Sequence, residues 1–230
     1  MKIFLMCQGK GILWREESKI SEKLPSEVKH LLLINGEHLV CRTLRQLKGN
    51  DVTLVGLGDI FRKYCSHIFT LREPTGSLID GIIRTSPRWD ENGILFLLGD
   101  VVYSNYAISV ILSGVYSKSP FTLFGRLTGN LYTGKARKEI FALYIPSMTD
   151  EMCNLFEQIR QKSSAGLWDL YNVSKMIVPI ADYTDDIDSP EEYIKFYSKL
   201  QDRVNWDDNF GRIGYGTNNF RKQAAIDQLG

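Results

Sequence analysis

The chain alternates between short, continuous apolar runs and segments that repeat apolar residues at helical spacing. Apolar runs of this length, bounded by glycine or polar residues, are typical of buried strands. They occupy residues 2–7, 31–34, 51–57, 67–71, 93–100, 121–124, 139–145 and 175–180. Helical spacing predicts helices at 37–47, 74–84, 105–112, 148–162 and 190–200, with one or two helical turns at 59–64. This alternation predicts an α/β protein, a three-layer α/β/α sandwich with a mostly parallel sheet, whose ligands bind at the carboxyl ends of the strands.

The first apolar run ends in a glycine-bearing loop. After Gln8 the sequence continues Gly9-Lys10-Gly11, with Arg15 close behind. A strand that ends in such a turn can bring its backbone close to a ligand, and the exposed amide N–H groups form a concavity that binds anions. Lys10 and Arg15 add positive charge. The sequence therefore predicts a phosphate-binding loop, although glycines that only make a strand-to-loop turn would give the same spacing.

Two acidic positions lie far apart in the chain. Asp100 ends the apolar run 93–100, and an aspartate there is costly to bury without a cavity, a cation or a helix N-terminus to face. Asp188, with Asp186 beside it, directly precedes the predicted helix 190–200. Two carboxylates brought together from distant segments suit Mg²⁺. Taken singly, Asp100 fits capping of the next helix as well as it fits a ligand site, and the acidic residues Asp186 and Asp188 fit a helix N-terminus better than a metal site.

Three motifs in this order resemble the nucleotidyltransferase superfamily, which includes sugar-phosphate and molybdenum-cofactor nucleotidyltransferases. They are residues 9–44 with the glycine loop and Lys29-His30-Leu31-Leu32, the strand end Gly99-Asp100-Val101, and the segment 186–193. The resemblance covers residues 2 to about 200. Two positions depart from the pattern: Arg15 follows the glycines late, and Val28 stands where the superfamily usually has proline before the lysine.

The resemblance implies a nucleotide-diphospho-sugar transferase-like fold and an Mg²⁺-dependent enzyme. It would join a nucleoside triphosphate to a phosphorylated acceptor, with a sugar 1-phosphate as the first candidate, and release pyrophosphate. The implied catalytic residues are Arg15 and Lys29. The implied nucleotide-binding residues are Gln8, Gly9, Lys10, Gly11, Ser77 and Asp100; the metal ligands are Asp100 and Asp188, and the acceptor-binding residues are Arg126 and Lys135. Helix capping by Ser77 and a solvated charged hairpin around Arg126 and Lys135 are the structural alternatives.

Two other functions stay open. A glycosyltransferase of the related fold would use a nucleotide-sugar donor, but such enzymes usually carry Asp-x-Asp at the metal strand, where this chain has Gly99-Asp100-Val101-Val102. A catalytically silent binding protein is the third class, because the spacing of Arg15 and the presence of Val28 depart from the active pattern.

The 230 residues predict one nucleotidyltransferase-like domain at 1–204, with a nucleotide-binding half at 1–113 and an acceptor-binding half at 114–204. Residues 205–230 form a tail or appendage that is rich in asparagine, glycine and charge. The composition is ordinary for a globular protein, with 43% hydrophobic and 24% charged residues.

The net charge, the cysteine spacing and the hydropathy limit the binding partners and the cellular location that the sequence allows. A formal net charge of +1 gives no reason to expect general nucleic-acid binding. The four cysteines lack Cys-x-x-Cys spacing, so neither a zinc site nor a disulfide framework is indicated. The apolar run after Met1 is too short for a signal peptide, and no later run could span a bilayer, which predicts a cytoplasmic protein without membrane contact. The oligomeric state is left open.

Overall fold

The structure is a computed structural model. It describes residues 1–8, 28–57, 60–73, 75, 77–89, 91–115, 119–162 and 165–201. The predicted site residues Gly9, Lys10, Gly11 and Arg15 lie outside the described residues, and so does the tail at 205–230. Their assignments therefore stay predictions.

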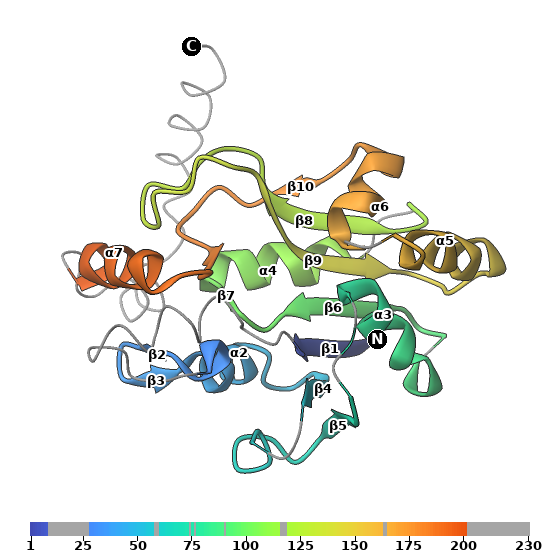
Figure 1. The fold of residues 1–230 in the computed structure, drawn as a ribbon, viewed down its shortest axis with the longest axis horizontal. Helices are drawn as coiled ribbons and strands as arrows, with labels where there is room; N and C mark the ends of the chain where they lie inside the picture. Colours follow the sequence, from blue (N-terminus) through green and yellow to red (C-terminus); the bar gives the residue numbers. More distant parts are fainter. Residues whose placement is uncertain are drawn as a thin grey trace.

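A seven-stranded sheet forms the centre of the molecule, in the order β10-β8-β9-β6-β1-β4-β5 (Figure 1). The strands are β1 Lys2–Cys7, β4 Asp51–Leu57, β5 Ile68–Leu71, β6 Ile94–Leu98, β8 Thr122–Arg126, β9 Glu139–Ile145 and β10 Val178–Pro179. Only β9 runs antiparallel to its neighbours, β6 and β8; the other pairs are parallel. The predicted mostly parallel sheet is confirmed, and strands from both predicted halves share it.

The central strands are buried on both faces, as their continuous apolar runs predict. In β1, Ile3 and Leu5 pack into one hydrophobic core, and Phe4 and Met6 pack into a second core on the opposite face. This division follows directly from the two-residue period of a strand, which turns successive side chains to opposite faces.

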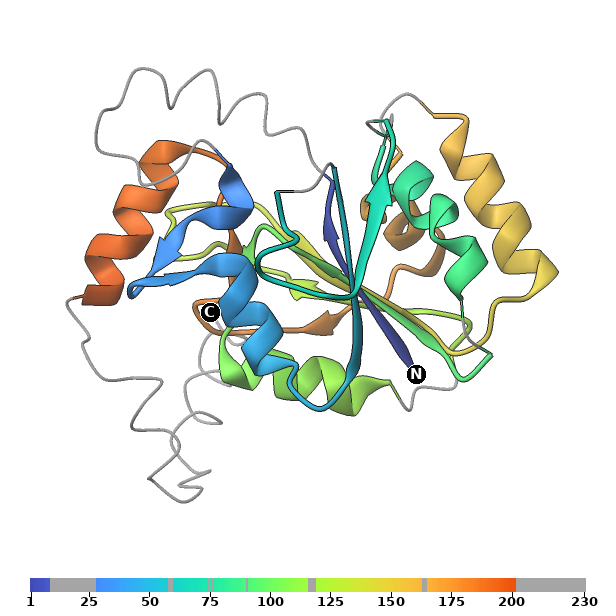
Figure 2. The same cartoon turned by 90° about the horizontal axis from the view of Figure 1, so that it is seen from below.

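Helices cover both faces of the sheet. Their bounds are α2 Leu39–Gln46, α3 Leu78–Arg84, α4 Asn105–Gly114, α5 Asp150–Arg160, α6 Leu167–Ser174 and α7 Pro190–Gln201. Figure 2 shows α2 and α4 on one side of the sheet and α3 and α5 on the other. The three-layer fold is therefore confirmed. Among the described residues, no helix combines the length and hydrophobicity needed to cross a membrane.

The predicted strand at 31–34 is wrong in its first half. Residues Lys29–Leu31 form a short 3₁₀ helix, η1, and only β2, Leu33–Ile34, is extended. It pairs antiparallel with β3, Glu37–His38, around Asn35 and Gly36, whose φ angles are 52° and 80°. An Asn-Gly pair tolerates these positive φ angles, so it makes a tight hairpin rather than the end of a sheet strand.

Other predicted elements differ in extent. The described residues 60–64 form turns rather than a helix, and the strand predicted at 175–180 contracts to β10. Helix α6 was not predicted at all. Its eight residues bury Leu167 and Leu170 against the sheet, but the segment carries no long amphipathic repeat.

A two-residue antiparallel pair sets the position of the site. Strand β7, Val101–Val102, follows β6 and pairs with β11, Asp185–Asp186. The pairing brings the acidic segment before α7 to the carboxyl end of β6. A third apolar cluster, which includes Ile34 of the hairpin and Phe196 of α7, holds both elements beside this pair.

Candidate functional site

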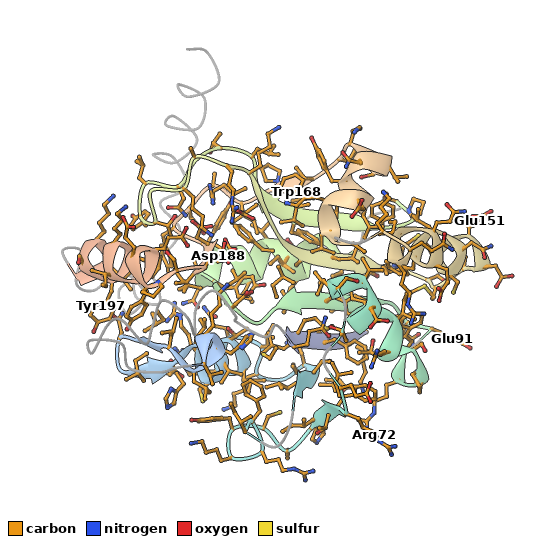
Figure 3. All side chains as sticks on the ribbon, in the orientation of Figure 1. Arg72, Glu91, Glu151, Trp168, Asp188 and Tyr197 are labelled. Atoms are coloured by element: carbon orange, nitrogen blue, oxygen red, sulfur yellow. The ribbon has the colours of Figure 1, made fainter. Side chains whose placement is uncertain are left out.

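Lys29 joins two carboxylates from distant parts of the chain. Its Nζ donates hydrogen bonds to Asp100 Oδ2 at 2.9 Å and to Asp188 Oδ1 at 2.7 Å. Helix η1 positions Lys29, Asp100 follows β6, and Asp188 lies beside the start of α7 (Figure 3). The three predicted residues therefore meet in one place, at the carboxyl ends of β1 and β6.

Two cations from the connection between β8 and β9 approach Asp188 from another direction. Lys135 Nζ lies 2.8 Å from Asp188 Oδ2, 2.6 Å from Asp186 Oδ1 and 3.4 Å from Glu192 Oε2. An Nη atom of Arg137 lies 2.7 Å from the same Asp188 Oδ2. The predicted acceptor residue Lys135 is thus part of the same cluster as Lys29.

The ion pairs fix the charge states at the centre of the cluster. Burial alone would lower the pKa of Lys29, but Asp100 and Asp188 raise that pKa well above its ordinary value. Burial opposes ionisation of Asp188, yet Lys29 and Lys135 hold the pKa of Asp188 far below its usual range. Burial and the nearby charge of Asp188 raise the pKa of Asp186. Negative charge is therefore in excess around Asp186.

The donor set and the local charge fit a divalent cation. Ligand oxygens of Glu139, Asp186 and Asp188 all lie within 4.8 Å of one another. Among the described residues, the cluster joins five acidic side chains to three cations; they are Asp100, Glu139, Asp186, Asp188 and Glu192 with Lys29, Lys135 and Arg137. All the acidic donors are carboxylate oxygens, the ligands that Mg²⁺ prefers. Asp100 and Asp188 stay the predicted ligands, and Glu139 and Asp186 join them as candidates.

Gln8 and Ser77 lie at a separate position, where β1 ends beside α3. Gln8 Nε2 donates to Leu78 O at 3.4 Å, and Ser77 Oγ accepts a hydrogen bond from Asp80 N at 3.1 Å. Ser77 therefore caps α3, as the structural alternative expected. Gln8 is buried, and among the described residues its Oε1 has no hydrogen-bond partner. The nucleotide-binding roles of both residues stay predictions.

Arg126 is buried away from the cluster of Lys29 and Lys135. One Nη atom lies 2.7 Å from Asp185 Oδ1, and the other donates to Thr128 O and, at 2.9 Å, to Arg137 O. Thr133 also donates to the Asp185 carboxylate. Arg126 thus ties the β8–β9 connection to β11, and its role in acceptor binding stays a prediction.

Glu139, Glu192 and Arg137 are the members of the cluster that were not among the predicted site residues. Glu139 begins β9, and the strand's six following residues, 140–145, are apolar and buried. A carboxylate at the start of such a strand is the signal that would have singled it out, because burial requires a partner. Arg137 supplies that partner through an ion pair. Arg137 itself has no distinguishing signal among the basic residues of the β8–β9 connection.

Comparison with known proteins rests on structure alone. No family model matches the sequence, and no curated protein matches it. Many solved structures are similar to the chain, and three of them illustrate the likeness. They are a protein assigned as a glucose-1-phosphate thymidylyltransferase from Bacillus anthracis, an inositol-1-phosphate CTP transferase from T. maritima, and HddC from Yersinia pseudotuberculosis.

The first aligns with a TM-score of 0.63 at 13% identity, covering 90% of this chain and 97% of its own. The second gives 0.55 at 13% identity, with 89% and 98% covered. The third gives 0.53 at 16% identity, with 86% and 99% covered. Two of the names state transfer of a nucleotide to a sugar or inositol phosphate. At this identity the likeness shows the fold alone, and the chain therefore shares the α/β fold of these structures, as predicted.

Proposed function

We propose that the protein is an Mg²⁺-dependent nucleotidyltransferase that joins a nucleoside triphosphate to a phosphorylated acceptor, with a sugar 1-phosphate as the first candidate. The observation that carries the proposal is the meeting of Lys29 with Asp100 and Asp188 at 2.9 and 2.7 Å. These residues come from three segments that the superfamily motifs name, and they lie where ligands bind in α/β sheets. The fold of the similar structures supports the same reaction class.

In this reaction an oxygen of the acceptor phosphate attacks the α-phosphorus in line. A new P–O bond forms as the bond between the α-phosphorus and the bridging oxygen breaks, and pyrophosphate leaves with that electron pair. Lys29 is held in place by its two carboxylates, so it can stabilise negative charge that develops on the α-phosphate. Arg15 is proposed to act on the leaving pyrophosphate. No protein nucleophile is required.

Asp100 and Asp188 are the proposed ligands of Mg²⁺, which would orient the two substrates and reduce the repulsion between their phosphates. The carboxylate oxygens of Glu139, Asp186 and Asp188, which lie within 4.8 Å of one another, support this role. Lys135 supplies positive charge for the acceptor phosphate, and its hydrogen bonds to Asp186 and Asp188 fix its position. Arg126 is the second proposed acceptor-binding residue, and it bonds the backbone of this region at Arg137 O.

The triphosphate would bind along the carboxyl end of β1. The glycine loop Gly9-Lys10-Gly11 is proposed to hold its phosphates. Gln8 presents an unpartnered Oε1 among the described residues, beside Ser77 at the start of α3. A neutral amide in an apolar setting suits an uncharged polar group better than a phosphate, so Gln8 and Ser77 are proposed to face the nucleobase or ribose.

The proposal is tested by measuring pyrophosphate release with Mg²⁺. Each of the four common ribonucleoside triphosphates and dTTP is offered with a pool of sugar 1-phosphates. The Asp100→Asn variant replaces one proposed metal ligand, a charged carboxylate, with a neutral amide that binds a divalent cation more weakly. Asp51→Asn is its matched control, because Asp51 pairs with Lys2 at the opposite end of β1 and is half exposed.

Release with one triphosphate, retained in Asp51→Asn and lost in Asp100→Asn, is the expected result. Release that is equal in both variants would contradict the role of Asp100. Absence of release with every pair, together with thermal stabilisation by nucleotide-sugars but not by triphosphates, would favour a glycosyltransferase of this fold instead.

A further inference from the structure

Three cations from two segments occupy the carboxylate of Asp188. Oδ1 accepts from Lys29 at 2.7 Å, while Oδ2 accepts from Lys135 at 2.8 Å and from Arg137 at 2.7 Å. A carboxylate oxygen offers two lone-pair sites, so Lys135 and Arg137 together fill those of Oδ2. A divalent cation approaching Asp188 would compete with these groups for the oxygen and would also be repelled by their charge.

The three cations are held with unequal strength. The Lys29 side chain is only 10% exposed and bonds a second carboxylate, Asp100. The Lys135 side chain is 4% exposed and has two further acidic partners, Asp186 and Glu192. The Arg137 side chain is 66% exposed, and its one other acidic partner among the described residues is Glu139. Since exposed ion pairs contribute little to stability, Arg137 can leave Asp188 at little cost.

A phosphate monoester is the ligand that would draw Arg137 away. The planar guanidinium fork matches two phosphate oxygens, and such bidentate, charge-assisted pairs are stronger than a single contact to a carboxylate. Arg137 and Lys135 both lie in the connection between β8 and β9, so both side chains can bind the same anion.

We infer that Arg137 is an acceptor-phosphate residue that rests on Asp188 until the acceptor binds. When Arg137 turns to the phosphate, one lone pair of Asp188 Oδ2 becomes free to bind a cation, and a neighbouring positive charge is removed. Acceptor binding therefore strengthens cation binding, and by linkage the cation strengthens acceptor binding equally. This inference rests on the proposed function, in which the acceptor carries a phosphate and Asp188 holds the metal.

The test measures Mn²⁺ binding to the full chain by the loss of its free-ion paramagnetic resonance signal, with and without inorganic phosphate as the probe. A protein-free titration corrects for Mn²⁺ bound by phosphate itself. In the wild-type chain, phosphate is expected to tighten Mn²⁺ binding by about fivefold or more, the lower end of ordinary coupling between sites. Arg137→Gln is expected to bind Mn²⁺ more tightly than wild type without phosphate, and to lose the phosphate effect.

Two further variants serve as controls for the test. Arg137→Lys keeps the charge but not the fork, so its phosphate effect is expected to lie between those of wild type and Arg137→Gln. Arg160→Gln is the matched control, because Arg160 also pairs with two carboxylates, Asp80 and Glu157, but lies on α5 at the opposite end of the molecule from α7 (Figure 1). It is expected to behave as wild type.

An unchanged Mn²⁺ affinity in Arg137→Gln, or a phosphate effect that persists in that variant, would overturn the inference. So would the absence of any phosphate effect in the wild-type chain. Pyrophosphate release without this coupling would leave the proposed function standing and reject the inference alone. Coupling without pyrophosphate release would keep the paired phosphate and cation sites and reject the proposed reaction.

Discussion

Lys29 Nζ lies 2.7 Å from Asp188 Oδ1, although 159 positions separate the two residues in the chain. Asp100 accepts from the same Nζ at 2.9 Å, so one ammonium group holds two carboxylates that would otherwise repel each other. Asp100 and Asp188 are partly exposed, whereas Lys29 is buried. Lys29 therefore has a structural role in assembling the site as well as the proposed role in charge stabilisation.

Replacing Lys29 with glutamine is expected to lower the free energy of unfolding by about 3 kcal/mol. This is the low end of the cost of breaking a buried ion pair, because the two carboxylates keep some contact with water. Pyrophosphate release is expected to fall by about 100-fold or more, as for loss of one group that stabilises transition-state charge. Urea unfolding and initial rates measure the two effects.

Lys2→Gln is the matched control for this change, because Lys2 forms an exposed pair with Asp51 at 3.0 Å at the other end of β1. Its cost is expected to be at most about 1 kcal/mol, with normal activity. Equal losses in the two variants would mean that Lys29 contributes no more than an ordinary surface lysine.

The buried pair of Arg126 and Asp185 gives a second prediction. Arg126→Met leaves the fully buried Asp185 carboxylate without its charged partner, which is expected to cost about 3–5 kcal/mol in the free energy of unfolding. The double variant Arg126→Met/Asp185→Leu removes both charges and is expected to recover at least half of that loss. A double variant with losses equal to the sum of the single changes would contradict the coupling, as chemical denaturation would show.

The sheet and Asp100 could be predicted because their signals are local. An apolar run such as 94–98 can only be a buried element, and an aspartate directly after it must find a cation or water. Lys29 and Asp188 could be predicted only from three motifs that occur in the expected order, since neither residue has a distinctive pattern of its own. The motifs predicted that these residues belong to one site, and the structure adds the ion pairs of Lys29 with Asp100 and Asp188.

The connection between β8 and β9 could not be predicted in the same way. Lys135, Arg137 and Arg126 are basic residues in a stretch without apolar periodicity, so the sequence cannot separate the two buried ones, Arg126 and Lys135, from the exposed Arg137. Which of these side chains is buried depends on β11, a two-residue strand that pairs with β7, a distant segment of the chain. Such a short pairing leaves no periodic signal in the sequence.

Gly81 in α3 gives a third prediction, because a Cβ at this position would lie 1.8 Å from Gln8 Oε1 and 1.9 Å from Nε2. Alanine is a better helix former than glycine by about 1 kcal/mol, but Gly81→Ala forces Gln8 away from Leu78 O. We expect Gly81→Ala to destabilise the wild-type chain and to stabilise the Gln8→Ala variant by up to about 1 kcal/mol. Thermal unfolding of the four proteins measures this, and an effect of the same sign in both backgrounds would contradict the contact.

His30 predicts a loss of stability at acid pH. Its ring is buried against Phe61, with centroids 5.9 Å apart. Burial lowers its pKa, Asp100 opposes that effect, and Lys29 adds to it, so the pKa falls to about 4. In the unfolded chain the pKa of the histidine has its ordinary value of about 6.5. Between about pH 6.5 and 4 the ring is therefore protonated in the unfolded chain and neutral in the folded chain. The stability from neutral His30 is therefore complete above about pH 6.5 and is lost as the pH falls toward 4.

His30→Asn removes this titration and isolates it from the other groups that bind protons in the same range. At pH 7.5 the variant is expected to be less stable than wild type, because it loses ring contact with Phe61. Between pH 7.5 and 4.5 the wild-type chain is expected to lose about 2 to 3 kcal/mol more than the variant, since one pKa unit corresponds to about 1.4 kcal/mol. Urea unfolding of both proteins at four pH values gives the difference. A constant gap between the two curves would show that the folded protein accepts a proton on His30 as readily as the unfolded chain, and that burial does not keep the ring neutral.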